Sequence, residues 1–164
     1  MAQTAPGMGE WEVEARLESA FRMGGGDGPA FPTIVGAGEN GCTLHYTLNR
    51  SRIREDQLVL LDGGAEVDLY DGDVTRTYPA AARYSSRQLE VYRLVLSAHQ
   101  AAIRAIRPGA PVSQIHEAAL GQLTAGLVDL GILQGDTEEL VEQEAYKPFF
   151  PHQTSHWLGL DVHD

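Results

Sequence analysis

Three of the six histidines of this chain lie within the segment His152-Gln-Thr-Ser-His156-Trp-Leu-Gly-Leu-Asp-Val-His163-Asp164. Imidazole is the commonest metal ligand and the side chain that exchanges protons near neutral pH. In an extended chain, His152 and His156 would share one face, whereas His156 and His163 would point to opposite faces. The segment therefore predicts a metal centre or a proton-transfer site. By contrast, His99 and His116 fall on predicted helices and are interpreted as surface or packing residues.

Two aspartates form a second candidate cluster. Asp62 ends the apolar run Leu58–Leu61, and Asp73 lies at the start of the next β-rich stretch. If these stretches pair as a hairpin, the two carboxylates lie side by side. Close carboxylates repel each other unless one takes up a proton or a metal ion neutralises them. The alternative interpretation is that Asp71 and Asp73 are only turn residues.

The elements that must position these residues follow from hydrophobic periodicity and from Gly, Pro and Ser signals. An amphipathic helix is predicted over Glu10–Arg22, ended by the glycine-rich run 24–28. Later helices are predicted from a Ser85 or Ser86 cap to Arg107, from a Ser113 cap to Leu130 with Gly131 as its stop, and over Thr137–Glu144. Strands are predicted near Thr33–Val35, Thr43–Thr47, Leu58–Leu61 and Val74–Tyr78. After Pro151 the chain is expected to be extended again. The order predicts an α+β fold, with helices packed against one face of an antiparallel sheet.

Composition limits the function classes. A chain of 164 residues suffices for one domain with a core, and its net charge of −11 argues against binding to nucleic acid or an anionic membrane. No apolar run approaches the roughly twenty residues of a membrane helix. Cys42 is the only cysteine and is interpreted as buried and structural. Residues 1–7 lack the features of a secretory signal, so a cytoplasmic protein is expected.

Three blocks of the sequence resemble the catalytic domain of aminopeptidase P, the Xaa-Pro aminopeptidase of the pita-bread metallopeptidase family. They are Thr33–Tyr46, Leu58–Thr77 and His152–Asp164. The last block resembles a motif shared by aminopeptidase P and prolidase, except that Gln153 stands where the family usually has a small residue. The similarity extends over essentially the whole chain from about Pro6, and it implies a pita-bread fold.

The resemblance implies a dinuclear metal centre. Asp62 would bind one ion, Asp73 would bridge both, and His156 would bind the second. Such oxygen-rich ligands with one imidazole suit manganese, with cobalt or zinc as substitutes. The centre would activate water to attack the carbonyl before a proline nitrogen. Arg76 would support Asp73 by its charge.

The resemblance also implies roles for three other histidines, namely His45, His152 and His163. They would orient the substrate, a peptide with proline at its second position, and stabilise the tetrahedral intermediate. His45 itself is placed on the predicted strand Thr43–Thr47.

The family centre has two further glutamate ligands that follow the histidine block. Residues 1–164 are therefore expected to form a partial catalytic domain, comprising the first half of the pita-bread fold and the first strand or strands of the second. We also expect residues 1–164 not to include the separate N-terminal domain of the family, and the full-length protein to be a homo-oligomer. We expect the chain alone to bind metal weakly and to be a poor peptidase.

Three functions compete with that of an Xaa-Pro aminopeptidase. The first is that of a prolidase, which cleaves only Xaa-Pro dipeptides. The second is that of a non-catalytic pita-bread module that binds a partner. The third, independent of the resemblance, is that of a mononuclear iron site with two histidines and one carboxylate.

Overall fold

The structure is a computed structural model that describes residues 3–164. Met1 and Ala2, which belong to the segment inspected for a secretory signal, lie outside the described residues. The chain forms two compact units, one containing residues up to Tyr84 together with His156–Asp164, and the other Ser85–Ser155. The α+β composition agrees with the prediction.

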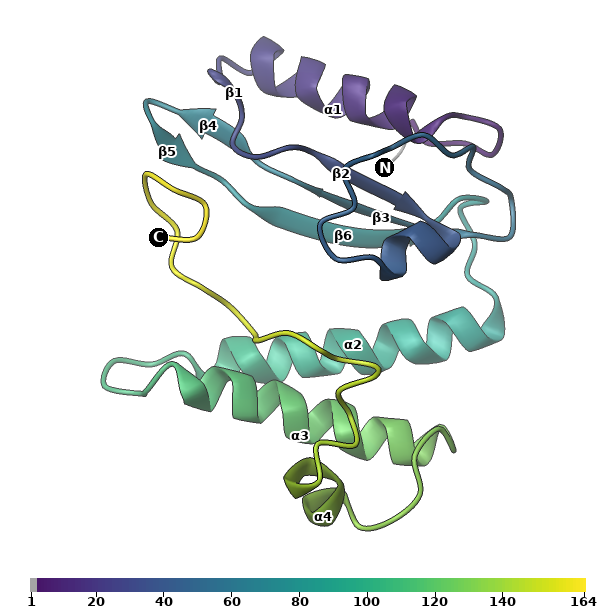
Figure 1. The fold of residues 1–164 in the computed structure, drawn as a ribbon, viewed down its shortest axis with the longest axis vertical. Helices are drawn as coiled ribbons and strands as arrows, with labels where there is room; N and C mark the ends of the chain where they lie inside the picture. The colour runs from purple at the N-terminus through teal and green to yellow at the C-terminus, as the bar shows by residue number, and fades with distance from the viewer. Residues whose placement is uncertain (1–2) are drawn as a thin grey trace. The chain divides into compact units, whose positions relative to one another are not determined.

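The first unit is built on two small antiparallel sheets (Figure 1). The larger has the order β2-β3-β6, with bounds Ile34–Ala37, Leu58–Gly63 and Val74–Pro79. The smaller has the order β1-β4-β5, with bounds Gly28–Pro29, Ala65–Val67 and Tyr70–Asp71. In the larger sheet Asp62 faces Thr75 and Gly63 faces Val74. Asp73 therefore directly precedes the strand that pairs with the strand of Asp62.

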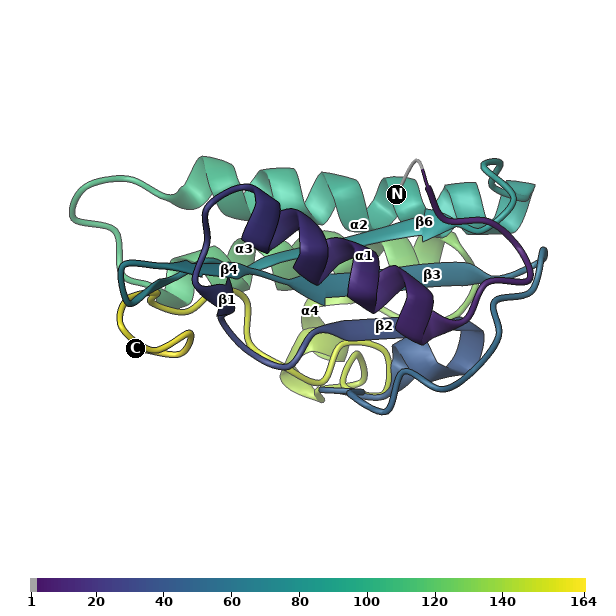
Figure 2. The same cartoon turned by 90° about the horizontal axis from the view of Figure 1, so that it is seen from above.

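Helix α1 (Glu10–Met23) lies along the larger sheet, against β2 (Figure 2). The core beneath it contains Val13, Val35, Ile53 and Val59, which are almost fully buried. The helix begins where Gly9 N–H donates to the Glu12 carboxylate at 2.7 Å. It ends at Gly24, as the glycine-rich run predicts.

The segment between β2 and β3 differs from the prediction. It begins as a short 3₁₀ helix, η1 (Gly38–Cys42), and continues without the strand predicted at Thr43–Thr47. His45 and Asn49 have φ of 52° and 46°, values that a β-strand does not tolerate. Cys42 is exposed, so its interpretation as a buried residue was wrong. We refer to residues 37–51 as the His45 loop.

The second unit contains α2 (Ser86–Ala105), α3 (Ser113–Asp129) and α4 (Thr137–Glu142), of which α2 and α3 pack along each other. The two helices approach closely, because a Cβ on Gly126 would overlap the Leu94 side chain. Helices α2 and α4 both end two residues earlier than predicted.

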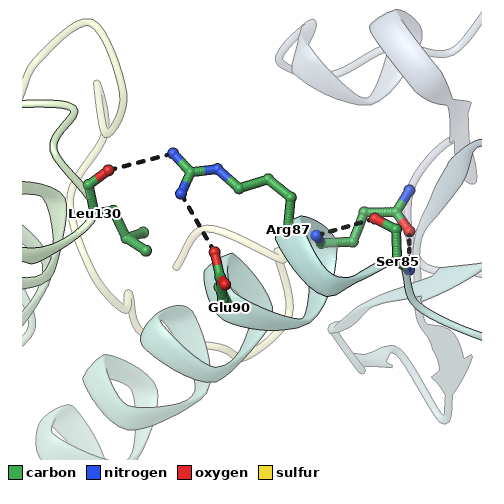
Figure 3. A network of polar contacts seen from close by, with 5 residues as sticks. Ser85, Arg87, Glu90 and Leu130 are labelled. Carbon is green, nitrogen blue, oxygen red and sulfur yellow. Dashed lines mark hydrogen bonds and ion pairs between the residues drawn. The ribbon is translucent and has the colours of Figure 1, made fainter.

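Local signals define the helix ends of this unit. The Ser85 hydroxyl caps α2, as expected, by accepting a hydrogen bond from Gln88 N–H at 3.3 Å (Figure 3). The guanidinium of Arg87 donates both to the Glu90 carboxylate and to the Leu130 carbonyl, which follows α3. Gly131, with φ of 69°, ends α3 as predicted, and its N–H donates to the Val128 carbonyl. The cap of α3 differs from the prediction, since Val112 occupies that position and no side chain caps it.

The histidine segment is irregular, and the predicted terminal strand does not form within the described residues. Residues His156–Asp164, the part of this segment that belongs to the first unit, are attached to β5 by two hydrogen bonds. Tyr70 O–H donates to the Leu158 carbonyl at 2.7 Å, and Asp71 N–H donates to the Gly159 carbonyl at 2.9 Å. No helix among residues 3–164 has the length and apolar character needed to cross a bilayer.

Candidate metal centre

The two predicted carboxylates lie together in the first unit. Asp62 accepts a hydrogen bond from Thr75 O–H at 2.7 Å on the neighbouring strand. Burial raises the pKa of Asp62 above its ordinary value of 3.8, the Thr75 hydrogen bond lowers it, and the charge and hydrogen bonding of Asp73 raise it again. The nearby His45 also lowers it. Asp62 is therefore a half-buried carboxylate whose charge lacks full compensation, which is the electrostatic condition for cation binding.

His156 meets this pair at Asp73. Its Nε2 lies 3.1 Å from Asp73 Oδ2, while its Nδ1 lies 2.8 Å from the Trp157 carbonyl oxygen. Because a carbonyl only accepts, Nδ1 carries a ring proton, and a lone pair on Nε2 would point at a carboxylate oxygen. Two lone pairs at this distance require a cation between them, either a second proton or a metal ion.

The spacing of these atoms also suits metal coordination. Two ligand atoms, each about 2.1 Å from one ion and at a right angle to each other, lie about 3.0 Å apart. The observed Nε2–Oδ2 distance is 3.1 Å. The hydrogen bond from Nδ1 to a backbone carbonyl is the arrangement that orients metal-binding histidines in proteins. The donor set therefore fits a divalent ion at His156 and Asp73.

No set of three or more His, Cys, Asp or Glu side chains within residues 3–164 converges on a single point that could hold a metal ion. Instead, Asp73 interacts with Asp62 on one side and with His156 on the other. Asp73 is thus placed as a ligand that two metal positions could share, and the three side chains do not surround a single metal position.

Two further predicted histidines lie beside this group. The ring of His163 is 4.1 Å from that of His156 and 6.3 Å from that of His45, measured between centroids. The prediction that His156 and His163 face opposite ways was therefore wrong. It assumed an extended backbone, and the chain here is irregular.

A cleft of about 320 Å³ opens at these residues. Asp62, Asp73, His45 and His163 contribute its polar groups. Its remaining lining is mostly apolar and consists of Phe31, Pro32, Ile34, Thr47 and Val162. The volume and the few converging polar groups are typical of a small-ligand site.

His152 belongs to the second unit. Its ring packs edge-on against Phe150 at 5.1 Å, and its Nδ1 lies 3.0 Å from the Gln153 carbonyl oxygen. On the other side, His116 stacks on Phe150 at 5.6 Å, and its Nδ1 lies 3.1 Å from Thr154 Oγ1. His116 is thus a packing residue, as interpreted from the sequence, while the role of His152 stays a prediction.

Arg76 lies on β6, just after Asp73, and two residues that support the site were missed. Arg76 donates to the Thr75 carbonyl, and its support of Asp73 by charge stays a prediction. Glu10 and Asn49, both buried, hold the His45 loop and were not singled out from the sequence. A glutamate in the first turn of a helix carries no sequence signal beyond its favourable interaction with the helix dipole.

Known proteins resemble this chain over its whole length. The model of metallopeptidase family M24 matches residues 1–164. The chain is 44% identical to the Xaa-Pro aminopeptidase of Escherichia coli (strain K12), with all 164 residues aligned to 37% of that protein. It is 43% identical to the Xaa-Pro aminopeptidase of Haemophilus influenzae, with all of the chain aligned to 38% of that protein.

Solved structures agree. The Pseudomonas aeruginosa aminopeptidase PepP matches with a TM-score of 0.97 and 49% identity, over 99% of this chain and 37% of that one. Zinc-substituted Escherichia coli aminopeptidase P in complex with product matches with a TM-score of 0.97 and 44% identity, over the same shares of the two chains. The chain therefore spans less than two fifths of the length of these relatives. The predicted resemblance and the partial pita-bread fold are confirmed, and the chain belongs to metallopeptidase family M24.

Proposed function

We propose that the protein containing this chain is a metal-dependent aminopeptidase that releases an N-terminal residue preceding proline. The observation that carries the proposal is the grouping of two carboxylates and one imidazole, in which Asp73 interacts with Asp62 and lies 3.1 Å from His156 Nε2. The names of the relatives supply the substrate class, since the compared proteins of Escherichia coli and Haemophilus influenzae are Xaa-Pro aminopeptidases.

Three side chains would hold the metal. Asp62 would bind one ion, His156 a second, and Asp73 both, in keeping with its contacts on either side. When bound, such ions supply Lewis acidity and lower the pKa of water. Carboxylate oxygens with one imidazole favour manganese, and one solved relative is zinc-substituted.

The remaining residues would act on the peptide. His45 and His163 line the cleft, so their N–H groups can donate to a substrate carbonyl and to the negative charge that develops on its oxygen. We assign His152 a similar role in orienting the substrate. The apolar wall of Phe31, Pro32 and Ile34 would exclude water and accept an apolar ring such as that of proline.

The test uses the complete gene product, purified without metal and then supplied with Mn²⁺. A tripeptide with proline at its second position and the corresponding Xaa-Pro dipeptide are assayed in parallel, with and without EDTA. We expect cleavage of the tripeptide and a loss of activity in EDTA that Mn²⁺ reverses. Cleavage of the dipeptide alone would identify a prolidase instead.

Metal analysis distinguishes a dinuclear peptidase from a non-catalytic module and from a mononuclear iron site. About two equivalents of metal with peptidase activity supports the dinuclear centre. Bound metal without peptidase activity on either substrate favours a non-catalytic module, and one equivalent of iron favours a mononuclear site.

A further inference from the structure

The carboxylate of Glu10 is completely buried at the first position of α1. Each of its oxygens accepts two hydrogen bonds. Oε1 accepts from Ala37 N–H and Asn40 Nδ2, both at 2.9 Å. Oε2 accepts from Tyr46 O–H at 2.9 Å and Ser51 N–H at 2.8 Å. A buried carboxylate costs solvation energy, so it persists only where donors of this kind surround it.

All four donors belong to the His45 loop. Ala37 and Ser51 mark its two ends, and Tyr46 directly follows His45. One side chain of α1 thus holds both ends and the middle of the loop. The backbone N–H of Glu10 adds a further bond, to the Ser51 carbonyl at 2.9 Å.

The middle of the loop lacks the apolar packing that would otherwise fix its conformation. Leu44 and Leu48, the residues on either side of the His45–Thr47 segment, are 60% and 65% exposed. His45 is itself exposed and has a left-handed backbone conformation, which costs free energy for a non-glycine residue. Such a conformation persists only when surrounding contacts impose it.

We propose that Glu10 is a positioning residue for His45, acting through Tyr46 and the two ends of the loop. The inference rests on the proposed function, because it assumes that His45 acts on the substrate. Glu10 does not face the cleft residues, so its effect on the reaction passes through the loop alone. Helix α1 has a separate attachment to the core through Val13, so it does not depend on this carboxylate for packing.

The principal variant is Glu10→Gln in the complete gene product loaded with Mn²⁺. Glutamine has the same shape, but its NH₂ group cannot accept from Ser51 N–H, which only donates. Glu14→Gln is the matched control, because it makes the same chemical change one turn further along α1. Tyr46→Phe removes the bond to Glu10 and the bond that the Tyr46 hydroxyl accepts from Asn40 Nδ2, and it serves if Glu10→Gln does not fold.

Four readouts accompany each variant: kcat and KM on the proline tripeptide, metal content, thermal midpoint, and hydrogen exchange of peptides covering residues 43–51. We expect Glu10→Gln to lower kcat about 10- to 100-fold, the scale of a displaced reacting group, while KM changes less than about threefold. Metal content should not change, because no metal ligand lies in the loop. Exchange in residues 43–51 should accelerate, and Glu14→Gln should match the wild type.

Other outcomes overturn the inference in distinguishable ways. Faster exchange in residues 43–51 with unchanged kcat would mean that Glu10 holds the loop but that the loop does not serve catalysis. Reduced kcat with unchanged exchange would place the effect elsewhere. If the wild type cleaves no proline peptide, the proposed function itself fails, and accelerated exchange would then leave Glu10 with a structural role only.

Discussion

Asn49 should be among the most sensitive residues of the first unit. It is 1% exposed, its Oδ1 accepts from Val35 N–H at 2.9 Å, and its Nδ2 donates to the Thr33 carbonyl at 2.8 Å. Strand β2 is an edge strand that pairs only with β3. The Asn49 amide therefore takes the place of a further strand along the free edge of β2.

The cost of Asn49→Ala follows from these contacts. Val35 and Thr33 are 0% and 1% exposed, so water cannot replace the lost partners. Each buried unpaired group costs about 1–3 kcal/mol, and an alanine in the left-handed conformation adds about 1–2 kcal/mol. We expect a loss of at least about 3 kcal/mol, a large share of the stability of a typical domain.

Urea unfolding of the 164-residue polypeptide measures this loss, with the exposed neighbour Arg50→Ala as control. Asn49→Gly separates the two contributions, because glycine removes the backbone strain but not the lost bonds. It should be about 1 kcal/mol less destabilising than Asn49→Ala. A loss below about 1 kcal/mol for Asn49→Ala would refute the reasoning about buried partners, and equal values for the two variants would refute the reasoning about strain.

Three other predictions concern the site and its support. The folded pKa of Asp62 is raised, so its contribution to stability is full below pH 3.8 and is lost as the pH rises through the folded value. Asp62→Asn should therefore lessen the fall in stability of metal-free protein as pH rises, and an unchanged pH profile in urea titrations would contradict this. Gly64→Ala would make a Cβ overlap the Gly72 carbonyl oxygen and should cost about 1–3 kcal/mol in urea unfolding, whereas Gly121→Ala, with open space, should not. His156→Ala should weaken Mn²⁺ binding, measured by calorimetry, by more than the roughly 10- to 100-fold that is typical when a residue hydrogen-bonded to a metal ligand is lost. His116→Ala should bind Mn²⁺ with nearly the wild-type affinity.

The sequence predicted those parts of the site that depend on local patterns. The apolar run before Asp62 and the β-rich stretch after Asp73 were sufficient to place Asp62 on one strand and Asp73 just before the neighbouring strand. Ser85, Gly24 and Gly131 marked helix ends, because caps and stops act within a few residues. Periodicity and turn chemistry are short-range properties, so they can be read directly from the chain.

The His45 loop could not be predicted in this way. Its alternating residues satisfy the pattern of a strand, yet its conformation is imposed by bonds across long separations. Tyr46 lies 36 residues from Glu10, and Ser51 lies 41 residues from it. The histidine segment was assigned wrongly for the same reason, since its hydrogen bonds to Tyr70 and Asp71 replace the partner strand that an extended segment would need.

The first unit is discontinuous, because Ser85–Ser155 is inserted between Tyr84 and His156. The Thr75–Asp62 bond closes a separation of 13 residues, whereas the Tyr70–Leu158 bond closes one of 88. Loop-closure entropy makes the longer connection about 1.7 kcal/mol more costly. Loop closure therefore favours the meeting of the two carboxylates before the imidazole of His156 joins them. During synthesis, Asp62 and Asp73 leave the ribosome before His156, the residue proposed to join them, has been translated.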